Sequence, residues 1–301
     1  RFLGNRRSIE IGGILMAIGQ FLMFFSAASS GAMAITLMWI GLTSLIIGNG
    51  FFKPNISTMV GQLYPKGDRR VDAAFTIFYM GINLGAFFSP LICGTLAEKI
   101  DFKWGFLAAG IGMVIGLFTF ILQKNRLLVD QDNKPIGMPS KPFGITQIGI
   151  VLLAIAVIFF FMNFKTMFNS DLDIIGYLIY GAMIVMPLII LTDKSLTKDE
   201  RDRIMVIFIL AFFVIFFWGA FEQAGASLTI FADRQTDRNL FGWEMPASYF
   251  QSVNPLAIIL LAPLFSSLWL NLGNRGKEPS SPKKMAIGLA LVSLGYVVIA
   301  F

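Results

Sequence analysis

The 301-residue sequence is 56% hydrophobic and only 14% charged, whereas a soluble domain carries roughly 25% charged residues. This composition excludes a soluble globular protein. The 24 basic and 18 acidic residues give a net charge of +6, but the basic residues lie between apolar segments, so they indicate membrane orientation and not nucleic-acid binding. With one cysteine, Cys93, and no histidine, an intrachain disulfide and a histidine-based metal site are excluded.

Nine apolar segments of about twenty residues or more follow one another along the chain. They cover residues 9–28, 32–64, 73–97, 104–122, 144–162, 174–192, 204–231, 246–272 and 284–301. A helix needs about 20 residues to cross the roughly 30 Å of hydrocarbon in a bilayer. The sequence therefore predicts an all-α polytopic membrane protein.

The loops between these segments differ in charge. Of the 24 lysines and arginines, 18 lie in loops 1–7, 66–72, 124–141, 193–203 and 274–284. The alternate loops are poor in basic residues. Because cytoplasmic loops carry the excess of Lys and Arg, the first set is predicted to be cytoplasmic and the second set to lie on the outer side.

The longest connection, 123–143, is polar and contains three prolines, which predicts a boundary between two groups of helices. Segments 144–162 and 174–192 after it hold no charged residue, so we interpret them as a peripheral hairpin that faces lipid. The predicted organisation is therefore one helix bundle in 1–122, a linker with an inserted hairpin in 123–203, and a second bundle in 204–301.

Two charged residues, Lys53 and Glu222, lie deep inside apolar segments. A charge at the bilayer centre costs about 2.5–3.5 kcal/mol, so such residues usually face a bundle interior or an aqueous cavity. Lys53 is about 17 Å from the end of its segment at Tyr64, counting 1.5 Å per residue. The alternative is that Lys53 extends to the interface and Glu222 belongs to a structural ion pair; both are deeper than that arrangement favours.

Three further residues, two asparagines and a tryptophan, are candidates for the same site as Lys53 and Glu222. Asn83 shares a helix face with Tyr79, four residues away, and is either a site residue or an interhelical hydrogen-bond partner. Asn254 directly precedes Pro255, and the proline predicts a kinked or locally unwound helix that lines a cavity. Trp218 is one turn before Glu222, so its ring either walls the same cavity or packs against neighbours.

Five short stretches then carry a family resemblance. They are RFLGNRR at 1–7, GFFKPNIS at 50–57, FYMGINLGA at 78–86, FEQAG at 221–225 and FQSVNP at 250–255. The first resembles a basic loop of major facilitator superfamily transporters. The other four resemble, in order and spacing, the proton-coupled oligopeptide transporters of that superfamily.

The resemblance implies two six-helix bundles, with two extra helices between them in bacterial members. The chain would then be an internal fragment with nine of fourteen helices, from the third to the ninth, and 144–192 would be the extra pair. It further implies secondary active uptake of di- and tripeptides with protons across a bacterial inner membrane. The expected partners are the peptide, protons and the lipid bilayer; no cofactor and no obligatory protein partner are expected.

The resemblance also implies residue roles. Lys53 would bind the peptide carboxylate and take part in proton coupling, and Glu222 would be the coupling carboxylate. Asn83 and Asn254 would contact the peptide backbone or its amino end, and Trp218 would be an aromatic residue of the pocket.

Three other functions are alternatives to proton-coupled peptide transport. A major facilitator carrier of another solute, such as nitrate, a drug or a sugar, is the main alternative. A membrane enzyme is disfavoured because the sequence has no histidine and no pair of intramembrane carboxylates. A channel is disfavoured because isolated Lys53 and Glu222 form no selectivity ring.

Overall fold

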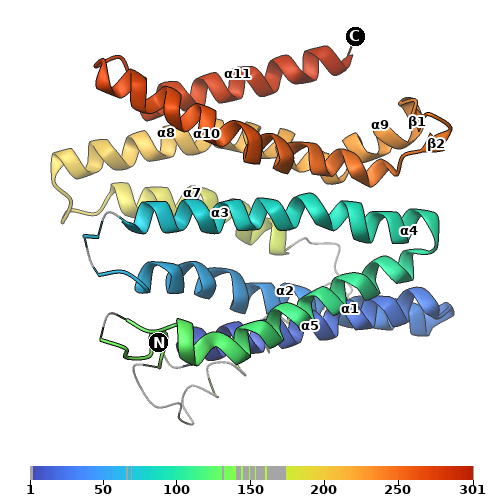
Figure 1. Cartoon of the computed structure of the whole chain (residues 1–301). Helices are drawn as coiled ribbons and strands as arrows, with labels where there is room; N and C mark the ends of the chain where they lie inside the picture. Colours follow the sequence, from blue (N-terminus) through green and yellow to red (C-terminus); the bar gives the residue numbers. More distant parts are fainter. Residues whose placement is uncertain are drawn as a thin grey trace. The chain divides into compact units, whose positions relative to one another are not determined.

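The fold is almost entirely helical (Figure 1). The structure is a computed structural model that describes residues 3–65, 67, 68, 70–130, 132–139, 144, 149, 153, 160 and 174–300. Its longer α-helices are α1 (Gly4–Ala28), α2 (Gly31–Gln62), α3 (Arg70–Ser89), α5 (Phe102–Leu127), α7 (Ile174–Leu191), α8 (Lys198–Phe221), α10 (Val253–Asn274) and α11 (Ser281–Ala300).

Shorter elements connect these helices or extend them. They are the π-helix η1 (Pro90–Gly94), α4 (Thr95–Lys99), the 3-10 helix η2 (Glu222–Gly225), α9 (Ser227–Gln235), the hairpin β1 (Asn239–Leu240) and β2 (Trp243–Glu244), and the 3-10 helix η3 (Ala247–Ser252). In the hairpin, Asn239 pairs with Glu244 and Leu240 with Trp243.

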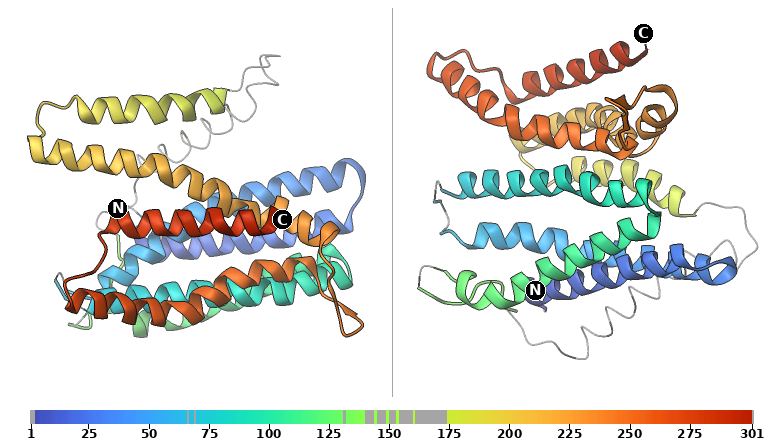
Figure 2. Two further views of the ribbon diagram at one scale, coloured as in Figure 1. Left: turned by 90° about the horizontal axis from the view of Figure 1, so that it is seen from above. Right: turned by 45° about the vertical axis from the view of Figure 1, so that its right-hand side comes forward.

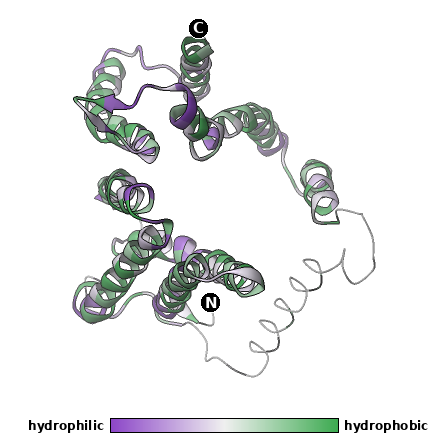
Figure 3. Cartoon of the chain, turned by 90° about the vertical axis from the view of Figure 1, so that its right-hand side faces the viewer, coloured by the Kyte–Doolittle hydropathy of each residue, from purple (hydrophilic) through white to green (hydrophobic). Residues whose placement is uncertain are grey.

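Seven helical stretches among the described residues are long and apolar enough to cross a membrane. Three of them combine successive elements: α3 with η1 and α4, α8 with η2, and η3 with α10. Figure 3 colours most of each helix as hydrophobic. These helices confirm the predicted multi-pass membrane protein. Most of predicted segment 144–162 lies outside the described residues, so the peripheral hairpin stays a prediction.

The chain forms two compact units, which are described separately. Unit 1 contains Arg1–Pro142 and Ala224–Glu278, and unit 2 contains Phe143–Gln223 and Pro279–Phe301. In unit 1, α1 packs against both α2 and α5, and α3 packs against both α2 and α10 (Figure 2). In unit 2, α8 packs against α7 and α11.

Glycines allow α1 and α2 to approach closely. A Cβ atom on Gly12 would lie 2.7 Å from the Gly48 carbonyl oxygen, and one on Gly48 would lie 2.7 Å from Met16 Cγ. Lipid tails are as apolar as leucine, so helices in a membrane associate through such close backbone packing rather than through the hydrophobic effect. The contact between α1 and α2 therefore depends on both glycines.

Replacing Gly48 with leucine is expected to separate α1 from α2 and destabilise the protein by about 1–3 kcal/mol, the usual cost of overpacking. The measurement is the apparent melting temperature of the purified protein in detergent. Gly50→Leu is the matched control, because a Cβ at Gly50 meets no other atom within 4 Å. Equal melting temperatures for the two variants would contradict the packing argument.

The N-terminal end of α1 is bound by hydrogen bonds to the end of α5 and the chain that follows it. The Arg6 guanidinium donates to the Ile136 carbonyl at 2.6 Å, to Asn125 Oδ1 at 3.1 Å and to the Leu128 carbonyl. The Arg6 backbone N–H also donates a hydrogen bond, to the Gly137 carbonyl at 3.2 Å. Arg6 is only 6% exposed, so part of the predicted 123–143 loop is an ordered partner of α1.

Three predicted spans differ from continuous α-helices, and in the first of them, 73–97, the π-helix η1 separates α3 from α4. Segment 204–231 is interrupted at Glu222, where α8 gives way to the 3-10 helix η2 and then, after Ala226 with φ −124° and ψ −101°, to α9. Segment 246–272 begins with the 3-10 helix η3, and Pro255 lies in the first turn of α10. A proline there lacks only an N–H that would have no intrahelical acceptor, so the irregular backbone precedes Pro255.

Candidate functional site

Lys53 lies in the interior of α2, immediately before Pro54. Its side chain is exposed and forms no ion pair with any residue that the structure describes. Pro54 has no N–H to donate to the carbonyl four residues earlier, at Gly50, which adds an available acceptor beside the lysine. Among the residues that the structure describes, Lys53 is thus a lysine without an ion-pair partner within a helix long and apolar enough to span a membrane.

Asn83 is buried in α3, with 6% of its surface exposed. Its Nδ2 donates to the Tyr79 backbone carbonyl at 2.8 Å, so the recorded hydrogen bond is within α3 and not between helices. The amide keeps a second N–H and the Oδ1 acceptor for other partners. The Tyr79 side chain on the same face is half exposed.

Asn254 is exposed in the first turn of α10, and both α10 and the preceding η3 pack against α3. The Ser252 hydroxyl donates to the Phe87 carbonyl at 2.8 Å. Asn83 is four residues from Phe87, and Asn254 is two residues from Ser252. Both amides therefore lie within about one helical turn of the same contact. Because α3 also packs against α2, three neighbouring helices of unit 1 supply Lys53, Asn83 and Asn254.

Glu222 and Trp218 belong to unit 2, at the end of α8 and the start of η2. The Glu222 side chain is exposed. Trp218 packs edge to face against Phe217 and Phe221, with ring centroids 5.7 and 5.4 Å apart. It also lines an apolar groove of about 760 Å³ between α8 and α11, whose recorded lining does not include Glu222. The structure thus places Trp218 among apolar side chains.

A tyrosine from α11 marks the point where α8 ends. Tyr296 donates its hydroxyl to the Ala220 carbonyl at 2.7 Å. The Glu222 backbone N–H donates to the same carbonyl and to that of Trp218. The last carbonyls of a helix lack partners within the helix, so Tyr296 stabilises the interruption beside Glu222. The sequence analysis missed Tyr296, since tyrosines in apolar segments are common.

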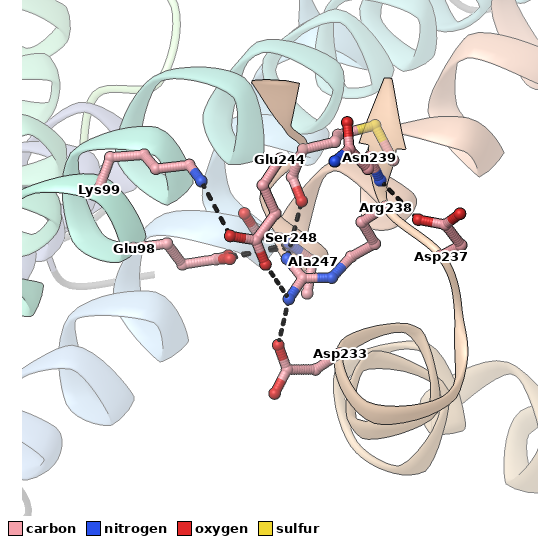
Figure 4. Close-up of polar contacts among 10 residues, drawn as sticks. Glu98, Lys99, Asp233, Asp237, Arg238, Asn239, Glu244, Ala247 and Ser248 are labelled. Carbon is pink, nitrogen blue, oxygen red and sulfur yellow. Dashed lines mark hydrogen bonds and ion pairs between the residues drawn. The ribbon is translucent and has the colours of Figure 1, made fainter. Parts of the chain in front are cut away.

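A polar cluster that the sequence analysis also missed lies where α4 meets η3 (Figure 4). Glu98 accepts the backbone N–H groups of Ala247 and Ser248 at 2.8 and 3.0 Å. Next to it, Glu244 pairs with Lys99 at 3.8 Å and with Arg238 at 3.1 Å, and Arg238 also pairs with Asp233 at 2.8 Å. These charges stand at the ends of predicted spans, where charge is ordinary, so the sequence gives no signal for the cluster.

Comparison with known proteins gives one consistent family. The PTR2 family model, described as POT family, matches residues 6–301. The chain is 34% identical to the peptide transporter YePEPT of Yersinia enterocolitica, covering 100% of this chain and 60% of the relative. It is 32% identical to a di-/tripeptide transporter of Lactococcus lactis subsp. cremoris, covering 99% and 60%.

A crystal structure titled peptide transporter POT in complex with sulfate has the same fold, with a TM-score of 0.81 and 31% identity over 99% of this chain and 60% of that chain. This likeness confirms the predicted major facilitator type of helical fold. The chain spans about 60% of the length of the curated relatives that it matches.

Proposed function

The chain belongs to the POT family of transporters, and from that premise we propose that the protein takes up di- and tripeptides together with protons by alternating access. The observation that carries the proposal is Lys53: a lysine deep in α2, exposed and without an ion pair among the described residues. Such a cation is costly in a membrane unless a ligand compensates it. A peptide carboxylate is an anion suited to that role.

The other candidate residues suit the rest of a zwitterionic peptide. The amides of Asn83 and Asn254 both donate and accept hydrogen bonds, as a peptide backbone requires. We assign Glu222 to proton coupling and Trp218 to the wall of the pocket. The proton is the coupling ion and no further cofactor is assigned.

The proposal extends to the bundles and the location. It assigns residues 1–122 to one helix bundle, 123–203 to a linker with an inserted hairpin and 204–301 to a second bundle. The excess of basic residues in alternate loops supports a bacterial inner membrane with those loops in the cytoplasm.

The direct test is uptake by the full-length protein in liposomes. Labelled dialanine is expected to enter faster with an inward proton gradient, and unlabelled trialanine but not free alanine should compete. If folded protein takes up no dialanine in either condition, the proposed substrate is wrong, and a carrier of nitrate, a drug or a sugar becomes the better hypothesis.

Replacing Lys53 with glutamine is expected to weaken dialanine binding roughly 10- to 100-fold, because a hydrogen bond to a charged group contributes about 1.5–3 kcal/mol. The measurement is the KM for dialanine and for its C-terminal amide. The unsubstituted protein should prefer free dialanine, and Lys53→Gln should lose that preference.

Lys277→Gln serves as the control for this variant, since Lys277 is an exposed lysine beyond the end of α10. It should keep the preference for the free carboxylate. A Lys53 variant that still discriminates against the amide would show that the carboxylate binds elsewhere.

A further inference from the structure

The strongest unassigned feature is a seam in unit 1 between α3, η1 and α4 on one side and η3 and α10 on the other. It starts at the Ser252–Phe87 hydrogen bond of 2.8 Å and continues with Thr95 Oγ1 and Tyr249 OH, 2.9 Å apart. It is narrowest at Gly94, where a Cβ would lie 2.1 Å from Ser248 Oγ. It ends at Glu98. We call this contact the outer seam.

The outer seam lies on the side of the membrane opposite the basic loops. Glu98 and Lys99 belong to the predicted loop 98–103, and Arg238 and Glu244 belong to the predicted loop 232–244. Both loops are in the set that is poor in basic residues. The seam therefore joins a segment of the proposed first bundle to a segment of the proposed second bundle on the outer side.

Glu98 makes a contact across the outer seam that depends on its charge. Both of its carboxylate oxygens are used, one accepting from Ala247 N–H and the other from Ser248 N–H. Hydrogen bonds to an ionised acceptor are shorter and stronger than neutral ones. A glutamine of the same size has one acceptor oxygen in place of two, so it loses one of these bonds together with the charge.

Ion pairs next to Glu98 add further contacts across the outer seam. Glu244 at the end of the hairpin is paired with Lys99 of α4 across the seam and with Arg238 on its own side (Figure 4). Arg238 also donates to the Met245 carbonyl at 2.7 Å, which fixes the chain just before η3. Glu98 thus meets a segment that is already held in shape.

We propose that Glu98 is a latch residue: its carboxylate, bound to the start of η3, holds the outer seam closed, and this contact must break for the outer side to open. The inference rests on the proposed function, because alternating access requires the bundles to separate on one side at a time. Glu98 acts through η3 and is a positioning residue, not a substrate ligand.

Cys93 provides a native reporter of the seam. It is partly buried and lines a cavity of about 350 Å³ together with Glu98, Ser248 and Gln251. In the full-length protein, with any cysteine outside residues 1–301 replaced by serine, a membrane-impermeant methanethiosulfonate reagent is applied to the outer side of spheroplasts. Glu98→Gln is expected to label at Cys93 about tenfold faster, with little change in apparent melting temperature.

The matched control is Asp101→Asn, a carboxylate on the same side of the membrane. Asp101 accepts the Lys103 backbone N–H at 3.0 Å and so caps α5; that N–H and the Lys103 ammonium hold the pKa of Asp101 below its usual value. Asparagine caps a helix as well as aspartate does. This variant should label at the unsubstituted rate.

Gly94→Ala tests the seam without removing the carboxylate. Its Cβ would lie 2.1 Å from Ser248 Oγ and 2.8 Å from Ser248 Cβ, so the two sides must move apart and labelling should again accelerate. Labelling of both variants at the unsubstituted rate would overturn the latch. Because labelling needs no peptide, faster labelling without dialanine uptake would refute only the proposed substrate, and normal uptake with unchanged labelling would refute only the latch.

Discussion

Replacing Glu222 with glutamine is expected to abolish accumulation of peptide against its gradient, so that the steady-state ratio of internal to external dialanine falls to about 1. Glutamine has nearly the size of glutamate but cannot bind and release a proton. Glu222 is the first residue of η2, where α8 ends. Its side chain is exposed and forms no ion pair with any residue that the structure describes.

The measurement separates coupling from binding. Exchange of labelled for unlabelled dialanine, without a proton gradient, is expected to survive in Glu222→Gln, because exchange requires movement of loaded carrier only. Asp202→Asn, an exposed carboxylate near the start of the same helix, should keep accumulation. Full, pH-dependent accumulation by Glu222→Gln would place the coupling carboxylate elsewhere in the protein.

Replacing Arg6 with alanine is expected to lower the apparent melting temperature by roughly 5–10 °C, which corresponds to about 3 kcal/mol in a protein of this size. The guanidinium satisfies the Ile136 and Leu128 carbonyls and the Asn125 side chain. Hydrogen bonds to charged groups contribute about 1.5–3 kcal/mol each, and removing one partner leaves the other unsatisfied.

Arg7→Ala is the matched control, because Arg7 is the next residue of α1 and its side chain is exposed. The measurement is thermal unfolding of both variants in detergent, monitored by fluorescence. If Arg6→Ala, Arg7→Ala and the unsubstituted protein have the same apparent melting temperature, the buried Arg6 contacts contribute little to stability.

The membrane spans are predictable because their signal is local: length and apolarity alone define them. The interruption at Glu222 is not predictable in the same way, since segment 204–231 contains no proline. There the short run Glu222–Ala226 adopts 3-10 and irregular backbone, and the Tyr296 hydroxyl is a second donor to the Ala220 carbonyl. That partner is 76 residues away in the chain.

The candidate site shows the same limit. Lys53, Asn83 and Asn254 attract attention in the sequence because polar residues in apolar segments are costly. That Asn83 and Asn254 lie close to one contact, however, depends on the hydrogen bond between Ser252 and Phe87, which are 165 residues apart. The sequence marks Arg6 as a basic residue of the RFLGNRR stretch but does not predict its burial, which depends on residues more than 100 positions away.

The bond from Tyr296 to Ala220 has a consequence for how unit 2 responds during turnover. It joins α11 to the end of α8, where the backbone changes from α-helix to 3-10 helix. If α8 and η2 straightened into a single regular helix, the Ala220 carbonyl would accept the backbone N–H four residues ahead, and the geometry of its hydrogen bond from Tyr296 would change. An environment-sensitive dye beside Tyr296 on α11 would therefore report a change of conformation at the end of α8.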